Sequence, residues 1–276
     1  MLNYRTNNGN IILENFNNFS LSQTLDCGQA FRWRETETNV WEGIAFGKFL
    51  KISQKDNIIC FHNTTLADFQ NIWINYFDLE RDYAKIIENI GSNKILRTAA
   101  NYGSGIRILR QDPWEALCSF IISQNNNIPR IKGIVERLCE NFGDKITGGY
   151  TFPSAQKIAT LSIDDLQVLR SGFRAKYILD AAKRVADGSL NLEKISSLPT
   201  ADARKELLKI YGVGEKVADC ALLYGMGHIN AFPKDVWIKR AVSLLFDGKF
   251  DENNYEYAGI LQQYIFFYAR ETHLNI

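Results

Sequence analysis

The chain has 276 residues, of which 46% are hydrophobic and 23% are charged, and its formal net charge is +1. This length suits two or three packed units, and the composition is that of a globular protein. No apolar run is long enough for a transmembrane helix, and the first residues lack the apolar segment of a signal peptide, so we expect a cytoplasmic protein without a membrane partner. The cysteines at positions 27, 60, 118, 139 and 220 form no CxxC pair, which indicates neither a disulfide framework nor a metal site.

Residues 20–62 have the alternating pattern of short strands. Phe31 and Trp33 alternate with Arg32 and Arg34, and the polar segment 55–57 separates two further apolar runs as a turn. We therefore predict an antiparallel sheet here, followed by a mixed and more helical region over residues 66–104.

Helical patterns begin at residue 112. Asp112, Pro113 and Glu115 form a good helix start, and the helix should run to about Ser123. The next helix carries an apolar stripe and should stop at Gly143. Further helices are predicted from the capping signal at 162–165 to residue 172, around 177–188, over 201–210, over 236–246 and from about 254.

A glycine turn, Gly212-Val213-Gly214, stands between two predicted helices and is followed by Lys216. A dinucleotide-binding fingerprint needs a third glycine where Val217 stands, and a P-loop needs Ser or Thr directly after its lysine. Both interpretations fail. The glycine turn between two helices exposes backbone N–H groups beside a helix N-terminus, which suits a phosphate.

Lys216 and Asp235 are the candidate catalytic residues. In the first turn of a helix, the macrodipole and partial burial disfavour the ammonium form of Lys216, and a neutral amine can form a Schiff base. The alternative is an ordinary solvated lysine. Asp235 can cap the helix that follows it, or it can stabilise positive charge that develops on a sugar. The residues alone leave these alternatives open.

At this point a resemblance is clear. GVGEKVADC, followed after about 15 residues by FPKDVW, resembles the signature of helix-hairpin-helix DNA glycosylases. CGQAFRWR at 27–34, SQNNNIPRIKGIVERLCENFG at 123–143 and SGFRAKYI at 171–178 are similar to segments of the 8-oxoguanine DNA glycosylases, and most closely of their bacterial, clostridial-like branch. The resemblance implies an α+β fold, with an N-terminal antiparallel β-sheet domain and flanking helices over 1–105. An all-α helix-hairpin-helix glycosylase core would follow over 106–276, with the hairpin at 211–215 and the lesion pocket between two helical subdomains.

The activity that the resemblance implies is that of a bifunctional DNA glycosylase and abasic-site lyase in base excision repair. The damaged nucleotide is flipped out of the duplex, Lys216 attacks C1′ of its sugar, and Asp235 stabilises the positive charge that develops there. The resulting imine acidifies C2′ and permits β-elimination. No cofactor is expected, and no iron–sulfur cluster, since no cysteine follows Cys220.

The resemblance also assigns base-binding residues. The carbonyl of Gly28 would accept the hydrogen that 8-oxoguanine carries on N7 and guanine lacks. Cys220 and Phe266 would sandwich the base, Gln262 would read its Watson–Crick edge, and Phe31 would form a pocket wall. Helix packing is the alternative for Gln262 and Phe266, as sheet core is for Phe31.

On the DNA side, Asn125 would fill the gap left by the flipped base, and Phe173 would act as a wedge at the base step. Arg130 and Arg174 would bond the estranged cytosine, with phosphate contact as the alternative. The hairpin residues Gly212, Val213 and Gly214 would hold the DNA backbone. The expected partner is double-stranded DNA containing 8-oxoguanine, preferably opposite cytosine, bound by a monomer associated with the nucleoid.

Two departures concern the opposite base. Phe173 stands where a tyrosine is familiar, and Trp237 stands where a histidine is familiar, so we expect a looser requirement for cytosine. The rival interpretations are an alkylpurine glycosylase of the same superfamily, which generally lacks the hairpin lysine, a non-catalytic helix-hairpin-helix DNA-binding module, and an unrelated lysine-dependent lyase for small carbonyls.

Overall fold

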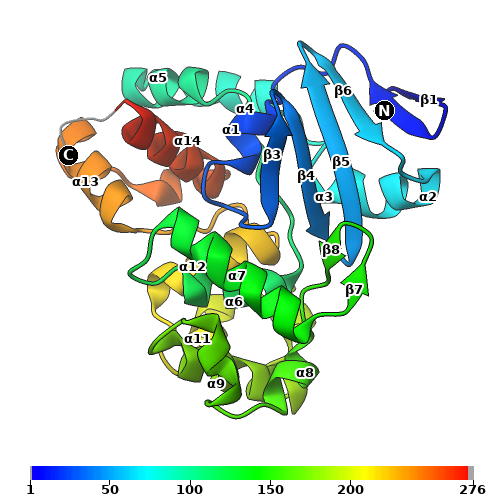
Figure 1. Ribbon diagram of the computed structural model, residues 1–276. Coiled ribbons are helices and arrows are strands. Elements are labelled where there is room, and N and C mark those ends of the chain that lie inside the picture. The colour runs from blue at the N-terminus through cyan, green and yellow to red at the C-terminus, as the bar shows by residue number, and fades with distance from the viewer. Residues whose placement is uncertain (1, 273–276) are drawn as a thin grey trace.

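A computed structural model describes residues 2–272 of the protein. The first part of the chain forms a six-stranded antiparallel sheet (Figure 1). Its strands are β1 (Tyr4–Asn7), β2 (Asn10–Leu13), β3 (Trp33–Glu37), β4 (Val40–Ala45), β5 (Lys48–Lys55) and β6 (Ile58–His62). They lie in the order β1-β2-β6-β5-β4-β3. The predicted antiparallel sheet is confirmed, and so is the turn at 55–57, across which Lys55 pairs with Ile58.

The start of this region differs from the predicted strands. Residues Leu21–Leu25 form helix α1, capped by Ser20, whose side chain accepts from the Gln23 N–H. Strand β3 begins only at Trp33, so Phe31 lies in the loop that precedes it. The segment between α1 and β3 is therefore a loop, and its Gly28 lies near side chains of the later helical region, those of Ile128 and Phe266.

One face of the sheet is covered by α2 (Leu66–Asp68), a π-helical segment η1 (Phe69–Trp73) and α3 (Ile74–Tyr76). Aromatic side chains dominate this interface: Trp33, Phe61, Trp73 and Phe77 are each no more than 2% exposed. The Trp33 indole N–H donates to the Tyr76 hydroxyl at 2.7 Å, so its buried polar atom is satisfied.

The rest of the chain is helical. In chain order the elements are α4 (Tyr83–Glu88), α5 (Lys94–Tyr102), α6 (Pro113–Ile122), α7 (Ile128–Phe142), the short strands β7 (Lys145–Ile146) and β8 (Gly149–Tyr150), α8 (Ala155–Ala159), the 3-10 segment η2 (Asp165–Leu169), α9 (Arg174–Ala186), α10 (Leu192–Ser196), α11 (Thr200–Leu207), α12 (Glu215–Gly225), α13 (Val236–Leu245), the 3-10 segment η3 (Glu252–Asn254) and α14 (Ala258–Glu271). The α+β class is confirmed.

Local capping signals explain most of these boundaries. The Asp112 carboxylate accepts from the Glu115 N–H at 2.9 Å at the start of α6, as predicted, and α7 ends before Gly143. At the predicted capping signal, Ser162 and Asp165 do exchange hydrogen bonds. However, the segment that follows is a 3-10 turn ending at Leu169. The last helix starts at residue 258, four residues later than predicted, after η3.

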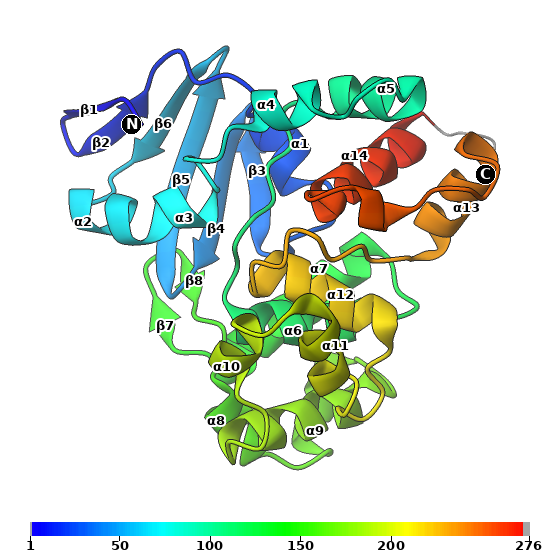
Figure 2. The ribbon, with the colours of Figure 1, turned by 180° about the vertical axis from the view of Figure 1, so that it is seen from behind.

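Two apolar cores result, one under the sheet and one among the helices. In the helical core α6 packs along α12, and α5 packs along α14, as Figure 2 shows from behind. Helices α4 and α5 join this second core although they precede residue 105, so the domain boundary expected there stays a prediction. Among residues 2–272, no helix is both long and apolar enough to cross a membrane.

Candidate active site

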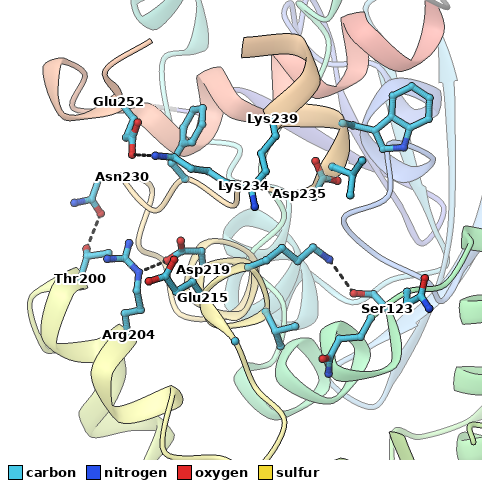
Figure 3. Close-up of a pocket in the computed structure, with 18 of the residues that line it drawn as sticks. Ser123, Thr200, Arg204, Glu215, Asp219, Asn230, Lys234, Asp235, Lys239 and Glu252 are labelled. Atoms are coloured by element: carbon cyan, nitrogen blue, oxygen red, sulfur yellow. Dashed lines mark hydrogen bonds and ion pairs between the residues drawn. The ribbon is translucent and has the colours of Figure 1, made fainter. Parts of the chain in front are cut away.

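A cavity of about 1110 Å³ opens where several helix ends meet (Figure 3). Ser123 comes from the end of α6, Phe173 from the start of α9, Lys216 from the first turn of α12, and Asp235 from the start of α13. The structure thus brings both candidate catalytic residues to one cavity, although 19 positions of sequence separate them (235 − 216).

The Lys216 amine is held by a neutral partner. Its Nζ donates to the Ser123 hydroxyl oxygen at 3.0 Å, while the Ser123 hydroxyl donates to the Phe120 carbonyl at 2.8 Å. The ring of Phe120 lies 5.6 Å from Nζ. Within the part of the chain that the structure describes, Lys216 forms no ion pair. The amine is therefore oriented at the cavity wall without a carboxylate bonded to it.

Asp235 is the N-cap of α13. Its Oδ1 accepts from the Ile238 N–H at 2.8 Å. Burial raises the pKa of this carboxyl, whereas the Ile238 N–H and the positive charge of Lys216 act in the opposite direction. The capping interpretation of Asp235 is confirmed, and the carboxylate also faces the same cavity as Lys216. Capping uses one oxygen, so a second lone-pair-bearing oxygen remains for a substrate.

The glycine turn has strict backbone requirements at one position. Gly212 has φ +79°, and a Cβ there would lie 2.4 Å from the ring of Tyr177. Gly214 is the N-cap of α12 and supplies no side chain to the first N–H groups of the helix. Because Gly214 and Lys216 both line the cavity, those N–H groups lie where an anionic group could reach them.

The predicted base-binding residues are not among those that line this cavity. Gly28 has φ +85°, and its Cβ position is 3.9 Å from the Phe266 ring, so these two predicted residues do meet. Phe31 packs edge-on against Phe120 with a ring separation of 5.8 Å. It belongs to the helical core, so the sheet-core alternative for Phe31 is wrong.

Cys220 and Gln262 are both 4% exposed. Burial raises the pKa of the Cys220 thiol to about 12, with Lys216 opposing, so the thiol is neutral. Gln262 donates to the Pro233 carbonyl at 3.3 Å, so it contacts the loop that leads to Asp235. Tyr224, on the same helix α12 as Cys220, stacks on Phe120 at 5.2 Å, and its hydroxyl lies 3.4 Å from Gln262 Oε1.

The predicted DNA-contacting residues differ in accessibility. Phe173 is 46% exposed at the cavity edge, as a wedge requires, and Asn125 is also on the cavity wall, with φ +46°. Arg174 is only 3% exposed. Its guanidinium donates to the carbonyls of Gln124 and Asn125 and stacks on the Phe173 ring at 4.5 Å. Arg174 therefore supports the asparagine-rich turn from inside, while Arg130 is exposed in the first turn of α7.

Sequence reasoning missed Ser123 and Tyr224. Ser123 opens the SQNNN segment and could have been noticed as a polar residue one step past an apolar helix. Tyr224 gives no local signal, because its role comes from partners on α6 and α14. Among residues 2–272, no cluster of three or more His, Cys, Asp or Glu side chains could hold a metal ion.

Comparison with known proteins agrees with this arrangement. Residues 11–117 match the model of the 8-oxoguanine DNA glycosylase N-terminal domain, and residues 118–260 match the HhH-GPD superfamily of base excision DNA repair proteins. The 8-oxoguanine glycosylase/lyase of Clostridium acetobutylicum, solved with double-stranded DNA containing cytosine opposite 8-oxoguanine, is 38% identical, with a TM-score of 0.93 over 98% of both chains. MBOgg1, solved with a low-affinity DNA ligand, is 40% identical, with a TM-score of 0.93 over 98% of this chain and 99% of that one.

The N-glycosylase/DNA lyase of Saccharomyces cerevisiae is 29% identical over 80% of this chain. This chain spans about two thirds of the yeast protein, since the match covers 66% of its length. The solved bacterial neighbour, in contrast, is matched almost end to end. The chain therefore belongs to the HhH-GPD superfamily of base excision DNA repair proteins, in the branch that carries the 8-oxoguanine DNA glycosylase N-terminal domain.

Proposed function

We propose that the protein is a bifunctional DNA glycosylase and abasic-site lyase that removes 8-oxoguanine from duplex DNA, with Lys216 as nucleophile and Asp235 as the essential carboxylate. The observation that carries this proposal is the meeting of Lys216 and Asp235 at one cavity beside the hairpin helix terminus. An alkylpurine glycosylase of the same superfamily uses the aspartate but generally lacks the hairpin lysine, which is present here as Lys216 and is held by Ser123.

The chemistry follows from these positions. As the bond between C1′ and the base breaks, the base leaves with the bonding electrons and the sugar becomes cationic, which the Asp235 carboxylate stabilises. The lone pair of the Lys216 amine bonds C1′, and the nitrogen then gives up one proton. The bond between C1′ and O4′ breaks, O4′ takes up a proton, and the opened sugar is left joined to Lys216 as a protonated imine. The imine acidifies C2′. Loss of a C2′ proton then expels the 3′ phosphate, which cleaves the strand.

The substrate is proposed to be duplex DNA with 8-oxoguanine, preferably opposite cytosine, which is the duplex bound by the Clostridium acetobutylicum enzyme in its complex. Phe173 and Trp237 are exposed at the cavity, where they would meet the duplex, and both depart from the familiar residues. The preference for cytosine should therefore be shallow. Similar excision rates from duplexes with each of the four opposite bases would support this, and a steep cytosine preference would reject it. We further propose a monomer acting on nucleoid DNA in the cytoplasm.

Borohydride trapping tests the catalytic assignment. Borohydride reduces only a Schiff base to a stable adduct, so a duplex with one 8-oxoguanine opposite cytosine should become covalently attached to the protein. Lys216→Gln should form no adduct, whereas Lys239→Gln, which removes another lysine from the same cavity, should still form one. Tight binding by the unmutated protein without an adduct would indicate a non-catalytic DNA-binding module or a monofunctional glycosylase instead.

A further inference from the structure

The loop around Gly28 is held by buried glutamines on both sides. Gln263, which is 1% exposed, donates from Nε2 to the Cys27 carbonyl at 3.1 Å. Gln111, which is 5% exposed, donates from Nε2 to the Gln29 carbonyl at 2.7 Å. A carbonyl can only accept, so these partners fix which end of each amide faces the loop.

Gln29 itself anchors the loop from below. Its Nε2 donates to the carbonyls of Thr24 and Arg107, both at 2.8 Å, and its Oε1 accepts from the Leu109 N–H at 2.9 Å. These three partners are backbone groups, Nε2 also approaches the Cys27 sulfur at 3.4 Å, and Gln29 is fully buried. The backbone on the C-terminal side of Gly28 therefore has little freedom to move.

The carbonyl between these two positions is different. The carbonyls of residues 27 and 29 are both occupied, yet within residues 2–272 no donor is bonded to the carbonyl of Gly28. An unoccupied acceptor between two occupied carbonyls is available for a ligand N–H. Its direction is set by the bonds on either side and by the φ of +85° that Gly28 adopts.

Both glutamines lead to the same residue of the catalytic helix. The Tyr224 hydroxyl donates to Gln263 Oε1 at 2.5 Å, which is much shorter than its 3.4 Å approach to Gln262. The Tyr224 carbonyl accepts the backbone N–H of Gln111 at 2.8 Å. Because Tyr224 lies two helical turns after Lys216 on α12, the two connections tie the Gly28 loop to the helix that carries the amine.

From this connection we infer that Gln263 and Gln111 are positioning residues for lesion recognition. They orient the Gly28 carbonyl toward N7 of the flipped base and fix the position of this carbonyl relative to Lys216. The inference rests on the proposed function and deepens it, since it names the residues that make the discrimination between 8-oxoguanine and guanine possible. An acceptor whose position is fixed by its neighbours, and which a bound base covers, favours the base that carries the N7 hydrogen and penalises the base that lacks it.

The test uses Gln263→Met, which keeps the volume of the side chain and removes its donor. In a Lys216→Gln background, which binds without reacting, the ratio of affinities for duplexes with 8-oxoguanine and with guanine opposite cytosine should fall roughly five- to tenfold, the worth of one hydrogen bond. Tyr224→Phe, which removes only the hydroxyl that orients Gln263, should lower the ratio in the same direction by less. Gln54→Met is the matched control, because Gln54 also bridges backbone groups but lies in the sheet domain.

A second readout separates positioning from general damage. A preformed abasic site has no base to recognise, so Gln263→Met with Lys216 intact should cleave it at nearly the rate of the unmutated protein. An unchanged affinity ratio in both Gln263→Met and Tyr224→Phe would overturn the inference. So would a loss of abasic-site cleavage as large as the loss of discrimination. The proposed function fails if Lys216→Gln alone does not discriminate between the two duplexes and the unmutated protein forms no adduct. Neither measurement involves Gln263→Met, so this failure is distinguishable from failure of the inference.

Discussion

Gly212→Ala tests the geometry of the hairpin. Alanine at φ +79° costs about 1–2 kcal/mol in backbone strain. Its Cβ would also lie 2.4 Å from the Tyr177 ring, and relieving such a contact costs a further ~1–3 kcal/mol. We therefore expect the free energy of unfolding to fall by about 2–5 kcal/mol, which lowers the melting temperature by roughly 4–10 °C in a chain of this size.

Gly214→Ala is the matched control two residues away. Gly214 has φ −102°, and no atom lies within 4 Å of its Cβ position. The only expected cost is that alanine is a poorer N-cap than glycine, which lowers the free energy of unfolding by under about 1 kcal/mol. Thermal unfolding of both variants should thus separate them clearly, and the same preparations should show weaker DNA binding for Gly212→Ala.

Tyr177→Leu completes the experiment. If the ring contact is the main cause, the Gly212→Ala change should cost less in the Tyr177→Leu background than in the unmutated protein. Equal costs in the two backgrounds would refute the steric part of the reasoning and leave backbone strain alone. Equal melting temperatures for the two glycine variants would refute both parts.

Three further variants probe charge and support at the cavity and in the buried helix α6. Asp235→Asn should keep the helix cap, because asparagine caps as well as aspartate, yet slow base excision about 10²–10³-fold in single-turnover assays; excision at the rate of the unmutated protein would leave Asp235 a capping role only. Burial raises the pKa of Glu115 from 4.5 to about 7 against the opposing charge of Arg32, so the stability that neutral Glu115 contributes is complete below pH 4.5 and is lost as pH rises through 7. As pH rises from about 5 to 8, the free energy of unfolding of Glu115→Gln should therefore fall by up to about 3 kcal/mol less than that of the unmutated protein. Melting experiments measure this, and parallel pH profiles would contradict it. Arg174→Met should weaken duplex binding whatever base lies opposite the lesion, since Arg174 supports the asparagine-rich turn; a loss confined to cytosine would show direct reading by Arg174 instead.

Local signals explain which elements could be predicted. The starts of α6 and α13 depend on a side-chain cap next to an apolar face, and such signals are complete within a few residues. The strands β1 and β2 went unpredicted although Asn8-Gly9, a favoured hairpin turn pair, joins them, with φ +48° and +78°. Their polar flanks hid the pattern, because β1 is largely exposed at the sheet edge.

The roles of side chains whose partners are distant in the sequence could not be predicted from local signals. Gln262 and Gln263 are neighbours on α14 with the same chemistry, yet one reaches Pro233 and the other reaches Cys27. Arg174 has the sequence context of an exposed DNA-contacting arginine, but it is buried against the carbonyls of residues 124 and 125. Which way such a side chain turns is decided by packing between elements, and a local pattern carries no information on it.

The bond between Gln263 and Cys27 joins residues 236 positions apart. Forming such a contact closes a long loop of the chain, and the chain loses conformational entropy before the contact can stabilise the fold. The sheet can form from early residues of the growing chain, because its strands are close in sequence. The Gly28 loop cannot take its final shape until α14 has been synthesised and has docked. During synthesis the sheet can therefore form before the loop is complete, and the recognition step proposed for Gly28 depends on the last helix of the described chain.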